Sequence, residues 1–93
     1  MEYIDVNWLH SNPDDPVRLV SELGPGRFET RKLEFFRDGR VGFASQAGST
    51  HDTHLGERPV PSLAQINIQT VFSGIEIAAS DFEAIWEQYV VNA

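Results

Sequence analysis

The sequence predicts a small α+β domain: an antiparallel sheet of about four to five strands, a C-terminal amphipathic helix packed on one face, and a second short helix. Three observations carry this prediction: apolar alternation near the N-terminus, an Asp38-Gly39 hairpin signal, and a capped apolar stripe over residues 80–91. The 93 residues suit a single domain, 1–93, because domains usually contain ~50–200 residues.

Residues 80–91 carry the pattern of an amphipathic helix. Ser80 and Glu83 form a Ser-x-x-Glu capping box, in which each side chain can bond a backbone N–H of the other residue. The apolar positions share one stripe at helical spacing: Phe82, Ile85, Trp86, Tyr89 and Val90. The sheet face expected beneath this stripe carries Val6, Trp8, Leu33 and Phe35.

Five segments carry strand patterns: 3–9, 17–23, 28–37, 40–47 and 71–79. Asp38-Gly39 should join the third segment to the fourth, because glycine readily adopts the positive φ of hairpin turns. A two-residue turn would set Arg37 opposite Arg40, and these like charges repel. A longer loop or a bulge is therefore the alternative.

Residues 46–61 form the longest polar stretch, in which glycine, serine, threonine and proline interrupt any periodicity. Loops of this length are uncommon in compact domains and are often functional or mobile. Ser62 and Gln65 then form a Ser-x-x-Gln capping box, and Leu63 and Ile66 lie one turn apart. This pattern predicts the short helix.

Composition indicates the cellular compartment of the protein and limits the classes of partner that it would bind. The chain has no cysteine and a net charge of −7, and its N-terminus lacks the basic and apolar segments of a signal peptide. We therefore expect a cytoplasmic protein. Negative charge argues against binding to nucleic acid or to an anionic membrane, since both attract cations.

The charge is unevenly distributed along the sequence. Every Lys and Arg lies between Arg18 and Arg58, whereas residues 1–17 and 59–93 carry only acids. We expect the central cations to pair with the acidic ends. The excess of acids has two interpretations: it provides solubility, or it steers the chain toward a basic partner.

Known catalytic and metal-binding motifs are missing from the sequence, which has neither a Gly-x-Ser-x-Gly elbow nor a phosphate-binding glycine loop. His51 and His54 flank Asp52, but His-x-x-His in a polar loop is a weak metal signal, and a solvated loop is the simpler interpretation. His10 with Asp14 and Asp15 could form an acid–base group, although turn chemistry explains both acids. We expect no catalytic residue, cofactor or metal.

Several patterns occur together in this order: Tyr3-Ile4-x-Val6-x-Trp8-x-His10, Asp15-Pro16, Ser21-Glu22-Leu23, Arg31-Lys32-x-Glu34-x-Phe36-x-Asp38-Gly39 and Phe82-Glu83-x-x-Trp86. The combination resembles a family of small bacterial domains of unknown function, over nearly the whole chain. The resemblance implies a compact bacterial fold and, through some members, an accessory or immunity-type role. It implies no catalytic residue.

These observations lead to a first hypothesis of a protein-binding inhibitor, an immunity protein or antitoxin that neutralises a basic toxin enzyme. The partner-binding residues expected are Asp14, Asp15, His10, His51, Asp52, His54 and Glu57. An alternative is a small ligand-binding or enzymatic domain that uses loop 46–61 as a lid, with Arg31 among its polar contacts. A third possibility is a homodimer that buries a sheet edge or the aromatic hairpin.

Overall fold

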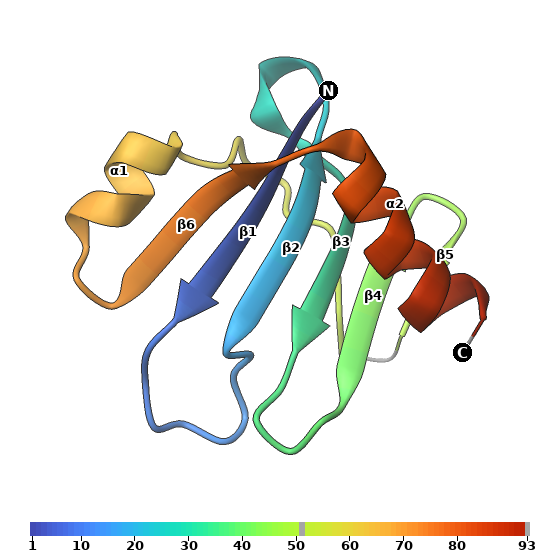
Figure 1. Cartoon of the computed structure of the whole chain (residues 1–93), viewed down its shortest axis with the longest axis horizontal. Coiled ribbons are helices and arrows are strands. Elements are labelled where there is room, and N and C mark those ends of the chain that lie inside the picture. The colour runs from blue at the N-terminus through green and yellow to red at the C-terminus, as the bar shows by residue number, and fades with distance from the viewer. Residues whose placement is uncertain (51, 93) are drawn as a thin grey trace.

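In residues 1–50 and 52–92, which this computed structural model describes, six strands form one antiparallel sheet in the order β5-β4-β3-β2-β1-β6 (Figure 1). The predicted α+β class, with its C-terminal helix on the sheet, is confirmed. The strand number exceeds the expected four to five because a two-residue strand forms inside the segment 46–61, where only a loop was expected.

The strands are β1 (Glu2–Trp8), β2 (Arg18–Leu23), β3 (Glu29–Phe35), β4 (Val41–Ser45), β5 (Gly48–Ser49) and β6 (Phe72–Ile77). The helical segments are a 3₁₀ turn η1 (Pro25–Arg27), α1 (Leu63–Ile68), α2 (Ala79–Trp86) and a π-helical turn η2 (Glu87–Val91). The capping box predicted for α1 is confirmed, since Ser62 and Gln65 bond each other's backbone N–H. Among the described residues, every helix is too short or too polar to cross a bilayer.

Helix α2 packs across one face of the sheet, called here the front face (Figure 1). Val20, Leu33 and Phe82 are 0% exposed and form the centre of this layer. Half-buried or partly exposed apolar residues surround them: Tyr3, Phe35, Val41, Phe43, Ile77, Ile85, Trp86, Tyr89 and Val90. The apolar stripe predicted for the C-terminal helix therefore does face the sheet.

The back face carries a second apolar layer, which α1 and the segment before it cover. Ile4, Val6 and Leu23 are buried there, and Val60, Leu63, Ile66 and Phe72 pack against them. The expectation that α2 covers Val6 and Trp8 is therefore wrong, whereas Leu33 and Phe35 do lie beneath it. Because both faces of the sheet are covered, the alternation in β1 could not indicate which face meets which helix.

The β3–β4 hairpin adopts the longer loop. Phe35 pairs with Val41, and the Phe36 N–H donates to the Arg40 carbonyl at 2.9 Å, which leaves residues 37–39 as the loop. Gly39 has a φ of +94°, as a three-residue hairpin loop requires. The two-residue register is wrong. The extra residue lets Arg37 and Arg40 point apart, since Arg37 donates to the His10 carbonyl and Arg40 donates to Asp38.

Helix α2 begins at Ala79, one residue before the predicted start. The Ser80–Glu83 capping box is wrong, because Ala78 alone separates the helix from β6 and places Ser80 inside the first turn. Asp81 takes the capping role instead, since its Oδ2 accepts the Ala78 N–H at 3.2 Å. The helix continues through η2 to Val91.

Side chains close parts of both sheet edges. On β6, the Asn67 amide donates to the Gly74 carbonyl at 2.9 Å and accepts the Gly74 N–H at 2.7 Å. Beside β4, the Thr50 hydroxyl accepts the Phe43 N–H at 2.9 Å and donates to the Phe43 carbonyl at 3.2 Å. These groups would otherwise be available to another strand.

Candidate functional site

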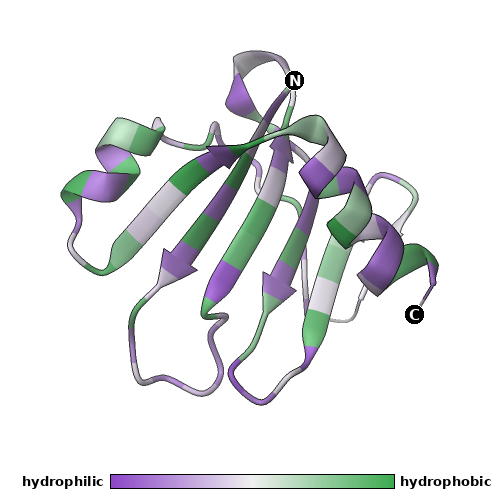
Figure 2. Cartoon of the chain, viewed as in Figure 1, coloured by the Kyte–Doolittle hydropathy of each residue, from purple (hydrophilic) through white to green (hydrophobic). Residues whose placement is uncertain are grey.

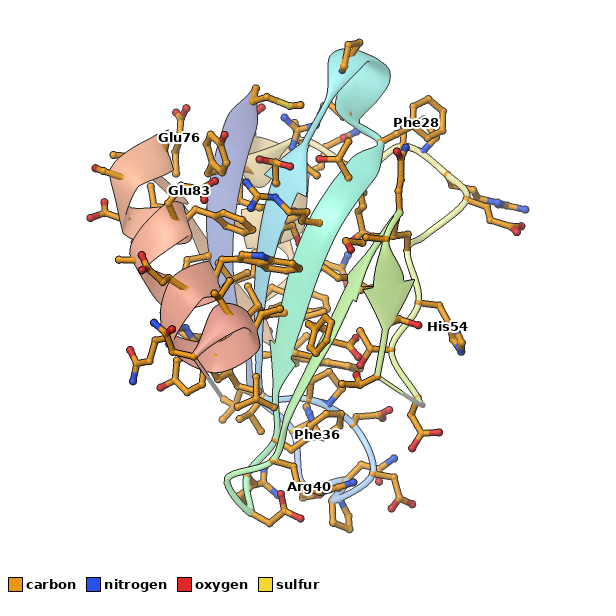
Figure 3. The ribbon with its side chains drawn as sticks, turned by 90° about the vertical axis from the view of Figure 1, so that its right-hand side faces the viewer. Phe28, Phe36, Arg40, His54, Glu76 and Glu83 are labelled. Carbon is orange, nitrogen blue, oxygen red and sulfur yellow. The ribbon has the colours of Figure 1, made fainter. Side chains whose placement is uncertain are left out.

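Two polar loops meet the β3–β4 hairpin at one end of the sheet, where Phe36 and Arg40 lie in Figure 3. A cavity of about 420 Å³ opens there, lined by Asp14, Asp15, Pro16, Glu34, Phe36, Arg40 and Asp52. We call its four carboxylates, Asp14, Asp15, Glu34 and Asp52, the acidic corner. Three of the seven residues predicted to bind a partner thus converge on one cavity from two separate loops.

The loop between β1 and β2 is organised by His10. Its Nε2 lies 2.8 Å from the Pro16 carbonyl, which can only accept, so Nε2 donates. Its Nδ1 accepts the Asn12 N–H at 3.0 Å, and the ring lies against Trp8, tilted by 58° with centroids 4.4 Å apart. Both ring nitrogens therefore bond the backbone. His10 shapes the loop and lies outside the lining of the cavity.

Asn12 fixes the two aspartates that follow it. Its Nδ2 donates to Asp15 Oδ2 at 3.0 Å, and its Oδ1 accepts the Asp14 N–H at 2.9 Å. This arrangement is an Asx-type turn, the turn chemistry that the sequence indicated. Asp14 is exposed and Asp15 is half-buried. Asn12 therefore fixes the backbone of Asp14 and the carboxylate of Asp15 beside the cavity.

Arg40 is the cation that lines this cavity. Its guanidinium lies 4.7 Å from the centroid of the Phe36 ring, and its Nε donates to Asp38 Oδ2 at 2.8 Å. The Arg40 backbone N–H donates to Asp38 Oδ1 and lowers the pKa of that carboxyl. The cavity therefore combines the acidic corner with one guanidinium and an aromatic ring.

The remaining predicted site residues lie elsewhere. His51 falls outside the described residues. His54 and Glu57 are exposed on the segment 52–60, and His54 projects away from Phe36 and Arg40 in Figure 3. Within the described part of the chain, His, Asp and Glu form no group of three that could hold a metal ion.

The long segment after β5 is anchored to the back face. Thr53 is 1% exposed, and its hydroxyl donates to Glu34 Oε1 at 3.1 Å. The Gly56 N–H donates to Glu29 Oε1 at 2.6 Å. A Cβ on Gly42 would lie 2.1 Å from the Thr53 hydroxyl, so β4 needs glycine where this segment crosses it.

A second depression, of about 940 Å³, lies between the β4–β5 turn and the end of α2. Arg31 dominates its polar wall and binds Glu22 through two bonds, at 3.0 Å and 2.6 Å. Arg31 also pairs with Glu83 and lies over the rings of Phe82 and Trp86, at 4.8 Å and 5.1 Å. These contacts engage both the charge and the flat face of its guanidinium.

The hydrogen bonds from Arg31 lower the pKa of Glu22 to about 2. The same bonds raise the pKa of Arg31 above its ordinary value. Glu22 is 6% exposed, and Thr30 also donates to its carboxylate at 2.7 Å. Both groups are therefore ionised at neutral pH and fully partnered, an arrangement that suits a structural ion pair.

The expected pairing of central cations with the acidic ends is confirmed. Among the described residues, ion pairs engage Arg18, Arg27, Arg31, Lys32 and Arg40. Three of these cations reach acids of the terminal segments: Asp5, Glu2 and Glu83. The local excess of positive charge in the middle of the sequence is thus neutralised within the fold.

Sequence reasoning missed four residues that line this cavity, namely Pro16, Glu34, Phe36 and Arg40. Glu34 alternates with Leu33 and Phe35 in β3, so its position on the back face was predictable. Its proximity to Asp52 depends on the path of a segment without periodicity. The sequence therefore offered no signal for that meeting.

Comparison with known proteins gives a family and no further relative. Searches of curated proteins and of solved structures find no match. A family described as a domain of unknown function, DUF6881, matches residues 2–91. That match spans the whole sheet and all the helical segments, and the chain therefore belongs to the DUF6881 family.

Proposed function

We propose that this protein is a cytoplasmic inhibitor, an immunity protein or antitoxin, that neutralises a basic toxin enzyme through its acidic corner. The observation that carries the proposal is the convergence of four carboxylates on one cavity that has Arg40 as its lining cation. The net charge of −7 and the absence of cysteine agree with an intracellular partner of opposite charge.

Charge at the corner supports fast association with such a partner. Acidic surfaces attract basic proteins over about a Debye length, ~8 Å at physiological salt, and raise the association rate. The corner, where acids outnumber the lining cation, is a surface toward which a basic partner would be steered.

The corner is also organised before any partner arrives. Asn12 holds the Asp14 backbone and the Asp15 carboxylate, and Thr53 bonds Glu34. A lysine or arginine of the partner could bind these carboxylates beside the Phe36 ring, where Arg40 already stacks. Carboxylates fixed in this way lose little freedom on binding, which favours affinity.

Charge reversal tests the proposal. The protein would be co-expressed with the products of its neighbouring genes, and the retained basic enzyme assayed with and without it. The double substitution Asp14→Lys and Asp15→Lys should slow association by roughly tenfold or more and relieve the inhibition. Stopped-flow or surface-based kinetics at two salt concentrations would measure this effect.

The double substitution Glu76→Lys and Glu87→Lys serves as the matched control, because both are exposed acids outside the lining of the cavity and the net charge changes equally. It should leave the kinetics nearly unchanged. Equal effects of the control and the corner variant would contradict the proposal, and so would the absence of any basic partner retained at low salt.

A further inference from the structure

A small cavity opens in the apolar layer on the back face of the sheet, and we call it the back pocket. Its volume is about 150 Å³. In Figure 2, green marks apolar residues along β1 and β2 and at the start of β6, three of the strands that contribute to it. Six of the residues that line the pocket are apolar: Ile4, Val6, Leu19, Val60, Ile66 and Phe72.

The size and the walls of the back pocket suit one small apolar group. Residues 59–75 contain no Asp, Glu, Lys, Arg or His, and this uncharged stretch supplies Val60, Ile66 and Phe72 to the wall. Apolar cavities of about 150 Å³ accept a molecule of the size of benzene. Larger ligands need roughly 300–1,000 Å³. The pocket therefore has room for a single ring.

Ser21 adds a hydroxyl to this apolar lining. The residue is 4% exposed, and its hydroxyl bonds no other described residue. Every fully enclosed side-chain N or O atom among the described residues has a hydrogen-bond partner. The Ser21 hydroxyl is therefore not fully enclosed, and the open space that Ser21 lines is the back pocket. A hydroxyl buried to this extent normally has a partner.

Glu29 is the second polar residue of the pocket, and its side chain is 10% exposed. Its Oε1 accepts the Lys32 ammonium at 3.2 Å and the Gly56 N–H at 2.6 Å. Its Oε2 accepts no bond from another described residue. Because Lys32 already balances the charge of Glu29, a further cation would lose its hydration without gaining an unpaired carboxylate. A neutral hydroxyl can donate to Oε2 without burying another charge.

We propose that the back pocket binds a small neutral alcohol or phenol whose apolar body is about the size of one benzene ring. The apolar wall buries the ring, and the ligand hydroxyl bonds Ser21 and the free oxygen of Glu29. The back pocket shares no lining residue with the cavity of the acidic corner. This binding is therefore independent of the proposed inhibition.

Nuclear magnetic resonance titrations with phenol and with toluene, which has the same ring but no hydroxyl, test the proposal. Both probes should shift the methyl signals of Ile4, Val6 and Ile66 in a saturable way. Ser21→Ala should weaken phenol binding about fivefold, because one net hydrogen bond is lost, and should leave toluene binding unchanged. The Ser21 hydroxyl bonds no other described residue, so urea melts of this variant should show an intact fold.

Ser73→Ala is the matched control, since Ser73 is an exposed serine of β6 outside the lining of the back pocket. It should bind both probes as the wild type does. The proposal is overturned if neither probe shifts the pocket methyl signals, or if Ser21→Ala binds phenol as tightly as the wild type. Equal losses of phenol and toluene binding overturn it too. The variant with Asp14→Lys and Asp15→Lys should still bind phenol, which separates this test from that of the proposed inhibitor.

Discussion

Glu22 and Arg31 show how single residues hold the front face together. Glu22 in β2, Arg31 in β3 and Glu83 in α2 join three elements through one guanidinium. A buried carboxylate is costly unless it is paired, and Glu22 accepts bonds from Arg31 and from Thr30. Alternation along β3 places Arg31 on the face of Leu33, but its partner on the neighbouring strand depends on register, which periodicity alone does not determine.

The pKa of Glu22 predicts a pH dependence of stability. This pKa falls from 4.5 to about 2 on folding, so the native state gains stability above pH ~4.5 and loses it as pH falls toward 2. At ~1.4 kcal/mol for each tenfold change in proton affinity, the contribution at neutral pH is about 3 kcal/mol. Glu22→Gln should lower the free energy of unfolding by an amount of this order at pH 7 and by much less near pH 2.

Denaturant melts at a series of pH values would measure this difference. Glu87→Gln, which removes an exposed carboxylate, is the comparison and should track the wild type. If the Glu22→Gln and wild-type curves keep the same separation down to pH 2, the ion pair contributes no pH-dependent stability.

At the scale of elements, one residue of the apolar stripe, Phe82, contributes more than the others to the packing of helix α2 on the sheet. Phe82 is 0% exposed, whereas Trp86 is half-buried at the rim of the large depression. The stripe was predictable because helical spacing is a local property. The start of the helix was not predictable, because it depends on the short connection from β6. The sheet face that the helix covers was not predictable either, because the sheet is covered on both sides.

Truncation of α2 side chains should follow burial. Phe82→Ala should lower the free energy of unfolding by about 3–5 kcal/mol, because it removes a fully buried ring between Val20 and Leu33. Trp86→Ala should cost less, since part of that side chain already meets solvent. Urea melts of the two variants would measure the loss in the free energy of unfolding. A larger loss for Trp86→Ala would show that the half-buried Trp86 contributes more to this layer than the buried Phe82.

At the scale of the molecule, the acidic corner lies at the hairpin tip beside β3 and β4, whereas β6 forms one edge of the sheet. Fold class, most strands and both α-helices could be predicted from local patterns. Strand order could not, because β6 pairs with β1 across nearly the whole length of the sequence. The acidic corner was predictable in part: Asp14 and Asp15 come from one turn, but Glu34 and Asp52 meet them only in the folded chain.

The bond pair between Asn67 and Gly74 has a consequence for solubility. A side-chain amide has the same donor and acceptor as a peptide, so here it stands where the next strand of a growing sheet would bind.

Asn67→Ala would leave that backbone position open while changing no charge. We expect a modest loss of stability, about 1–2 kcal/mol, and a much larger rise in the rate of aggregation, followed by light scattering and by dye binding to cross-β structure. Asn67→Asp, which can accept but not donate when ionised, should be intermediate; an Asn67→Ala protein that stays as clear as the wild type would show that another feature protects β6. One amide thus stands, at the centre of β6, where a seventh strand would bind.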